Sequence, residues 1–101
     1  MEKQRTRTKW NVSHREDEYG QDIFTIRKNP YKIILEKLML GGSNIKLYKN
    51  NIELSKKSSF TFEGGKRAVE YFKKNAEEIG KEYEDEINER RREVSMIKKS
   101  L

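Results

Sequence analysis

His14 is the only histidine in the chain, and it stands beside a cluster of carboxylates. A histidine can act as a general base and carboxylates can hold Mg²⁺, so these are the residue types from which a catalytic site could be built. The carboxylates are Glu16, Asp17, Glu18 and Asp22. Their spacing matches no calcium loop, and a single histidine in a polar segment does not build a nucleophile–base–acid set. We therefore expect no enzyme, no catalytic residue, no metal and no cofactor; a small metal-dependent nuclease is the remote alternative.

A second candidate site is the pair Gly64-Gly65, which is followed by Lys66 and Arg67. A glycine turn that leads into a helix N-terminus can hold phosphate through backbone N–H groups. The phosphate-loop motif GxxxxGK[ST] requires glycine at position 60 and serine or threonine at position 67. The chain has Phe60 and Arg67 there, which argues against nucleotide hydrolysis. Contact with a nucleic-acid phosphate stays open, and the alternative is that the glycines only turn the chain.

The charge distribution carries the most information about function. The net charge is +6, and it divides unevenly along the chain: +4 for residues 1–15, −4 for residues 16–22, +6 for residues 23–60 and zero for residues 61–101. Excess positive charge attracts the phosphate backbone of nucleic acid. The sequence therefore predicts that the N-terminal arm and the first 60 residues, rather than the C-terminal region, face an anionic partner.

The basic residues of the arm alternate, so Arg5, Arg7 and Lys9 would share one face of a strand. Tyr48 stands among lysines and could stack on a base between phosphate contacts. A solvated tail is the alternative for the arm. The residues that we predict to contact nucleic acid are Lys3, Arg5, Arg7, Lys9, Arg27, Lys28, Lys46, Tyr48, Lys49, Lys56, Lys57, Lys66 and Arg67.

Two strands are expected to carry the first of these residues. Residues 6–13 and residues 22–28 alternate between polar and β-branched or aromatic types, which is typical of strands. The polar, acidic segment 14–20 predicts the loop of an antiparallel hairpin. Trp10 and Val12 are expected to face the core, because large apolar residues are few in this chain.

A short core helix is expected over residues 30–40. Asn29 can cap it, Pro30 suits its first position, and apolar residues follow at helical spacing. Gly41-Gly42 would end it with a left-handed cap.

The second half of the expected sheet surrounds Asn50-Asn51, which tolerate positive φ and predict a tight hairpin within residues 44–55. Residues 58–62 could add a further short strand. From about Gly64 onwards the composition predicts one long helix. The expected order is ββαββα, an α+β fold with an antiparallel sheet covered by helices.

The C-terminal helix would outreach its own domain, because 34 helical residues span roughly 50 Å. We expect a compact domain over residues 1–80 and a protruding helical extension over residues 81–101, with Gly80 as a weak point. Its apolar stripe is too thin for a regular coiled coil. A protein partner or a second copy of the chain is the functional interpretation, and a solvated helix is the alternative. The predicted contacts are Tyr83, Ile87, Val94, Ile97 and Leu101.

Length and composition exclude several classes of protein. The chain has 101 residues, 40% of them charged, and no cysteine, so it holds one domain and neither disulfides nor thiolate metal sites. Its apolar runs, such as residues 33–35, are far below the ~18 residues of a membrane span. The first residues lack the apolar stretch of a secretory signal, so we expect a cytoplasmic protein. Heavy use of lysine, isoleucine and asparagine favours an AT-rich bacterium, or one of its phages or mobile elements, as the source.

These observations predict a small, basic, non-enzymatic protein that contacts DNA or RNA through its arm and a sheet face. The alternative is an inhibitor or adaptor of anti-defence type, encoded by a phage or mobile element, that docks on a host protein or a nucleoprotein complex.

Overall fold

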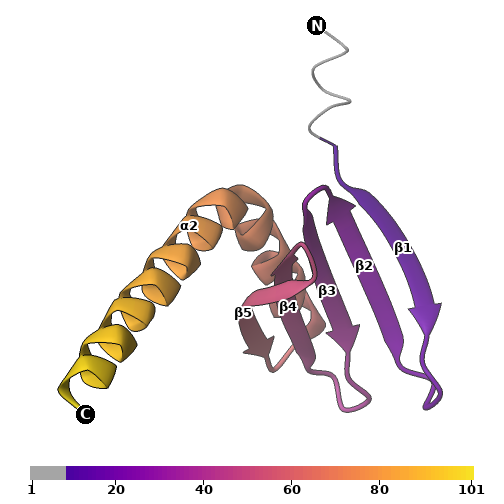
Figure 1. Cartoon of the computed structure of the whole chain (residues 1–101). Coiled ribbons are helices and arrows are strands. Elements are labelled where there is room, and N and C mark those ends of the chain that lie inside the picture. The colour runs from indigo at the N-terminus through magenta and orange to yellow at the C-terminus, as the bar shows by residue number, and fades with distance from the viewer. Residues whose placement is uncertain (1–8) are drawn as a thin grey trace, which may run out of the picture.

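The computed structural model describes residues 9–101, which form five strands followed by one long helix (Figure 1). The elements are β1 (Asn11–Glu16), β2 (Asp22–Lys28), β3 (Tyr31–Lys37), β4 (Ser43–Lys49), β5 (Ile52–Ser59) and α2 (Phe62–Ser100). The strands make a single antiparallel sheet in which each strand pairs with its neighbours in the sequence, in the order β1-β2-β3-β4-β5. The α+β class is therefore confirmed, with a simpler topology than expected.

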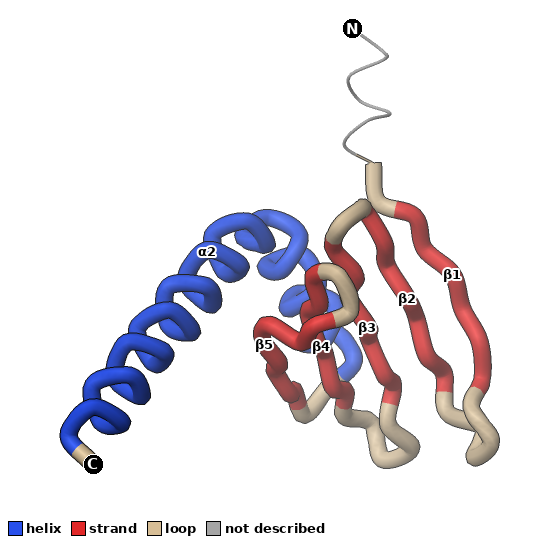
Figure 2. The backbone as a smooth tube through the Cα atoms, viewed as in Figure 1, coloured by secondary structure: helices blue, strands red, loops and turns tan. Residues whose placement is uncertain are grey.

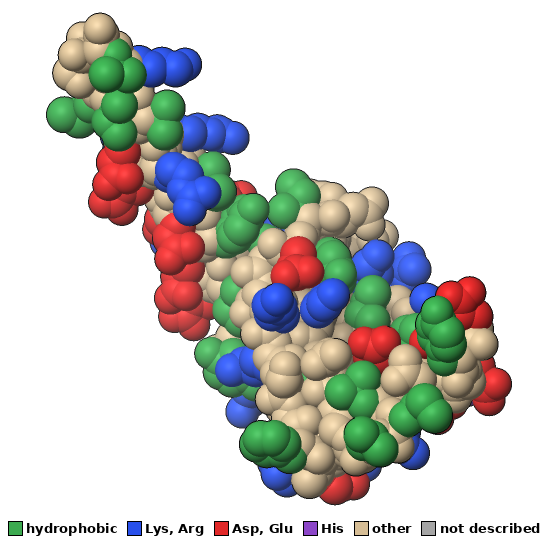
Figure 3. Space-filling model, turned by 90° about the horizontal axis from the view of Figure 1, so that it is seen from below, with side chains coloured by type: hydrophobic (Ala, Val, Ile, Leu, Met, Phe, Trp, Pro, Cys, Tyr) green, Lys and Arg blue, Asp and Glu red, His purple; other side chains and the backbone are tan. Residues whose placement is uncertain are grey.

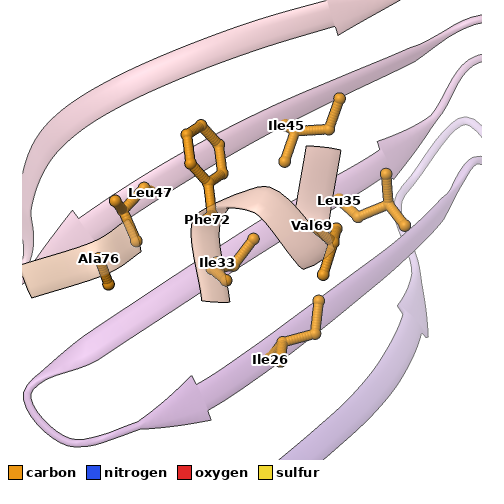
Figure 4. Close-up of a cluster of buried hydrophobic side chains, with 8 residues drawn as sticks. All are labelled: Ile26, Ile33, Leu35, Ile45, Leu47, Val69, Phe72 and Ala76. Carbon is orange, nitrogen blue, oxygen red and sulfur yellow. The ribbon is translucent and has the colours of Figure 1, made fainter. Parts of the chain in front are cut away.

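Helix α2 covers one face of this sheet, and no element within residues 9–101 covers the other face. Its first half lies behind the sheet in the view of Figure 2, against β3, β4 and β5. The core lies between these layers, where side chains from the middle strands meet Val69, Phe72 and Ala76 of the helix (Figure 4). Ile33, Ile45, Leu47 and Phe72 are fully buried there. One covered face and one open face is the usual arrangement of an antiparallel sheet.

The expected short helix over residues 30–40 is wrong, because Tyr31–Lys37 is strand β3. Ile33 and Leu35 are both buried and point to the helix side, so the buried residues recur with a period of two. A short apolar run such as 33–35 fits either periodicity, and pairing with β2 and β4 decides it. Asn29-Pro30, joined by a cis peptide bond, is a turn and not a helix start.

Glycine at position 41 does adopt a left-handed conformation, with φ +99°, but it turns a hairpin and does not end a helix. The Leu38 N–H donates to the Gly42 carbonyl at 2.8 Å, which closes the loop between β3 and β4. Asn50 and Asn51, with φ of 51° and 67°, make the predicted tight turn between β4 and β5. Both asparagines thus sit in the left-handed region that such hairpin turns require.

The boundaries of β1 and β5 differ from those predicted. His14 belongs to β1 and not to a loop, and the turn is confined to residues 17–21. Strand β5 ends at Ser59 and α2 begins at Phe62, so residues 58–62 are no separate strand. Val12 is 62% exposed rather than in the core, because α2 does not extend over β1.

The helix is continuous from Phe62 to Ser100, through Gly80, and it bends in its middle so that its second half leaves the sheet (Figure 1). The last buried position is Gly80, and none of residues 81–101 is buried. The Cα radius of gyration is 17.0 Å, against about 13 Å for a compact domain of this size. The division into a domain over residues 1–80 and an extension over residues 81–101 stays a prediction. Among residues 9–101, no helix has both the length and the apolar character that crossing a membrane requires.

Candidate nucleic-acid interface

The sheet register gathers four cations and one aromatic ring on the face that α2 leaves open. Successive residues of a strand point to opposite faces, and directly paired residues share a face. Arg27 pairs with Lys32 and Lys32 pairs with Tyr48 across β2, β3 and β4. In the next row, Lys46 pairs with Lys56 across β4 and β5. We call these five residues, Arg27, Lys32, Lys46, Tyr48 and Lys56, the basic sheet face.

Electrostatics make the basic sheet face receptive to anions. Both Arg27–Lys32 and Lys46–Lys56 place like charges directly opposite each other, an arrangement that destabilises a sheet. None of these four cations forms an ion pair with any residue that the structure describes. One carboxylate, Glu53, lies at the edge of the sheet opposite Tyr48. An anionic ligand would relieve the repulsion.

Tyr48 supplies a flat apolar surface within this charged area. Its side chain is half-buried, and the Lys32 ammonium lies 5.0 Å from the centre of its ring. Such a distance is that of a cation–π contact. The ring is therefore a flat aromatic surface directly beside a cation, the combination of groups on which single-stranded nucleic-acid binding relies in general.

The basic sheet face occupies one end of the sheet. At the other end, one row contains Arg15, Ile23, Glu36, Asn44 and Ser58 and has no net charge. Side-chain hydrogen bonds of 3.5 and 3.2 Å join Glu36, Asn44 and Ser58. Strand β1 starts at Asn11, opposite Arg27, so the chain enters the sheet at the basic end. Lys9, which is exposed, lies just before this point. The predicted residues Lys3, Arg5 and Arg7 lie outside the described residues.

Three of the lysines predicted to contact nucleic acid point to the face of the sheet that α2 covers, where they lie over aromatic rings. The ammonium-to-ring distances are 5.6 Å for Lys28 over Trp10, 5.9 Å for Lys49 over Tyr31 and 4.7 Å for Lys57 over Tyr71. Lys49 also lies 3.8 Å from Glu84 of α2. The structure thus separates these three lysines from the basic sheet face.

The Gly64-Gly65 pair has a packing role that the sequence interpretation missed. Both residues lie in the first turn of α2, and the Gly64 N–H already donates to the Thr61 hydroxyl at 2.9 Å. A methyl group on Gly65 would collide with the Ser43 side chain of β4, so only glycine lets the helix approach the sheet this closely. The pair neither forms a phosphate loop nor simply turns the chain. Lys66 and Arg67 remain exposed, on the helix and away from the basic sheet face.

The acidic cluster lies in and beside the turn between β1 and β2. The Asp17 carboxylate accepts from the backbone N–H groups of Tyr19 and Gln21, both at 2.9 Å, and from the Gln21 side-chain amide at 3.1 Å. These bonds, with the Gln21 backbone first, hold the pKa of Asp17 below its usual value. His14 Nε2 lies 2.8 Å from Asp22 Oδ1, across the β1–β2 hairpin. Within residues 9–101, no group of three metal-ligating side chains comes together.

Lys32 is the functional candidate that sequence reasoning missed. The expected helix over residues 30–40 hid it, since a helix would not pair Lys32 with Arg27 and Tyr48. Alternation within Tyr31–Lys37, with Ile33 and Leu35 facing inward, is the signal that could have placed it on the open face.

The second half of α2 carries the predicted partner residues along one stripe. Tyr83 and Ile87 are half-buried and, with Ile52 and Leu54 of β5, line a groove of about 410 Å³. Further along, Val94 is 46%, Ile97 57% and Leu101 98% exposed. Figure 3 shows apolar side chains at the tip of this projecting segment, with acidic and basic side chains along it. The stripe continues beyond the sheet, where none of the residues that the structure describes buries it.

No protein-family model, curated protein sequence or solved structure matches this chain.

Proposed function

We propose that this protein binds nucleic acid without acting as an enzyme, and that the basic sheet face is the binding surface. The observation that carries the proposal is the register of β2 to β5, which sets two pairs of like charges side by side on an open face. Phosphates would neutralise these cations, and the release of counterions would supply much of the binding free energy.

The strands that carry the four cations determine where the ligand would lie. All four cations stand on paired strands of one sheet, so the backbone positions from which their side chains extend are fixed before the ligand binds. Neighbouring strands lie about 4.8 Å apart, and the side chains of Lys46 and Lys56 thus start from directly paired backbone positions. Contacts with phosphate carry little sequence information, so we propose binding with little preference for base sequence.

Salt-dependent binding tests this proposal. The affinity for labelled DNA and RNA should fall steeply as the salt concentration rises, because each neutralised phosphate adds about 0.7–0.9 to the slope of log K against log salt. Replacing Lys46 by alanine should lower both the affinity and the slope. A flat salt dependence, or no binding at low salt, would contradict nucleic-acid binding.

Lys49→Ala is the matched control for Lys46→Ala. Both lysines are half-buried residues of β4, and both substitutions remove one positive charge. Lys49 belongs to the face that α2 covers, where it lies over Tyr31. The control should therefore keep the affinity and the salt slope of the unaltered protein, and equal losses in the two variants would show that only net charge matters.

A second candidate function rests on the exposed stripe of α2. The apolar side chains of Val94, Ile97 and Leu101 project beyond the sheet, as expected of a helix that docks on a protein. In this proposal the chain is an adaptor or inhibitor of a nucleic-acid-handling complex, or it pairs with a second copy of itself. Recovery of one protein partner after nuclease treatment, lost in Val94→Asp and kept in Lys46→Ala, would favour it over nucleic-acid binding.

A further inference from the structure

We infer that the ligand of the basic sheet face is a single-stranded nucleic acid, laid across β2 to β5 with a base stacked on Tyr48. The inference rests on the proposed function and adds the form of nucleic acid that the surface fits. Two observations carry it: the shape of the surface that holds the cations, and the placement of one aromatic ring among them.

The shape of the sheet disfavours reading a duplex groove. The four strands that carry the cations, spaced about 4.8 Å apart, span roughly 14 Å, whereas the major groove of B-DNA is about 12 Å wide and admits a helix or a two-stranded ribbon. Arg27, Lys32, Lys46 and Lys56 come from four adjacent strands, so they cannot enter a groove together. A flexible single strand, by contrast, can follow a broad open face.

The helix is less suited than the basic sheet face to contact the phosphates on both sides of a groove. The first half of α2 is packed on the opposite face of the sheet through Val69, Phe72 and Ala76. Its second half, residues 81–101, carries six basic and six acidic side chains and has no net charge. Five acidic residues at positions 82–89 precede the five basic residues at positions 90–99, so a groove would have to accommodate repulsion between its phosphates and the acidic part of this segment.

The placement of Tyr48 favours exposed bases. Its ring lies between Lys32 on one neighbouring strand and Glu53 on the other, and Lys46 precedes it by two residues on the same face. Stacking on an aromatic ring needs a base that is free of its own base pair, which single strands provide and a duplex does not. The Lys32 ammonium, now 5.0 Å from the ring centre, can instead meet the phosphate beside that base.

The test compares single strands with a duplex on the full chain. The probes are fluorescein-labelled oligothymidine and oligouridine of about 12 nucleotides, within the ~4–16 nucleotides that such surfaces cover, and a mixed-sequence DNA duplex of the same length. Fluorescence anisotropy is measured from about 50 to 200 mM salt. We expect at least one single strand to bind about tenfold more tightly than the duplex, and the two single-stranded probes distinguish RNA from DNA.

Variants of Tyr48 report on stacking. Tyr48→Ala should weaken single-strand binding about tenfold with an unchanged salt slope, and Tyr48→Phe should keep the affinity, because phenylalanine preserves the stacking surface. Tyr71→Ala is the matched control, since Tyr71 also has a lysine over its ring, at 4.7 Å, but lies on α2. Thermal unfolding checks that each variant is folded.

The outcomes distinguish a failure of the single-strand inference from a failure of nucleic-acid binding itself. Duplex binding as tight as single-strand binding, or equal losses in Tyr48→Ala and Tyr71→Ala, would overturn the single-strand inference and leave nucleic-acid binding in place. Absence of binding to all three probes at the lowest salt would overturn both.

Discussion

Lys46 of β4 and Lys56 of β5 lie directly opposite each other on the open face of the sheet. Neither has an acidic partner among the described residues, so the folded protein holds two repelling charges that an anion would neutralise. Stability and binding are therefore expected to oppose each other at this pair.

Lys56→Glu should stabilise the protein and weaken its binding to nucleic acid. An opposite-charge pair across two strands contributes about 0.2–1 kcal/mol, and the same change places a negative charge on the binding surface. Urea unfolding and fluorescence anisotropy measure the two effects. Lys57→Glu alters net charge equally on the other face, where Lys57 lies over Tyr71, so it should not stabilise and should leave binding nearly unchanged. If both variants lose affinity alike, location on the basic sheet face does not matter.

Two glycines of the same helix should respond oppositely to alanine. Gly65→Ala is expected to destabilise by about 1–3 kcal/mol, as overpacking does, because the new methyl group would meet Ser43 and come within 3.0 Å of Leu35. Gly80→Ala finds no neighbour closer than 3.7 Å and should stabilise by up to about 1 kcal/mol through helix propensity. Chemical unfolding of both variants measures this, and a loss of stability in Gly80→Ala would show that the bend of α2 needs glycine.

Asp17 should make the β1–β2 turn sensitive to acid. Its pKa is held below the usual value in the folded state by hydrogen bonds from Gln21, so its contribution to stability is full above the unfolded-state pKa and disappears as the pH falls through the folded-state pKa. Asp17→Asn should therefore unfold at a lower temperature than the unaltered chain at neutral pH and lose this difference in strong acid. Thermal unfolding at both pH values tests it, and an NMR titration of the Asp17 carboxyl should show the lowered pKa. A constant difference at all pH values would contradict this origin.

A charged residue introduced into the exposed apolar stripe of α2 should not affect folding. Val94 is 46% exposed and contacts no sheet residue in the core, so Val94→Asp should change the free energy of unfolding by no more than about 0.5 kcal/mol. Val69→Asp, on the same helix but only 6% exposed, should prevent stable folding, because it buries an unpaired charge. Circular dichroism with thermal unfolding distinguishes them. A large loss of stability in Val94→Asp would indicate that residues beyond Gly80 are already packed, against a second copy of the chain.

Much of the fold follows from local patterns in the sequence. Alternation identifies Asp22–Lys28 as a strand, positive-φ asparagines identify the turn at Asn50-Asn51, and the proline-free segment after Gly64 identifies the long helix. Each of these signals acts through near neighbours in the chain, so it needs no knowledge of the rest of the molecule.

Tertiary structure decided what local patterns leave open. Residues 30–40 carry an apolar run that suits a helix or a strand, and pairing of β3 with β2 and β4 made it a strand. The same pairing brought Lys32 beside Tyr48, and the pairing of β4 with β5 sent Lys57 to the opposite face from Lys56. A shift of one residue in register reverses the direction of every side chain in a strand. The number of cations in these segments is therefore a property of the amino-acid sequence, whereas the strand pairing of the folded chain sets which of them share a surface.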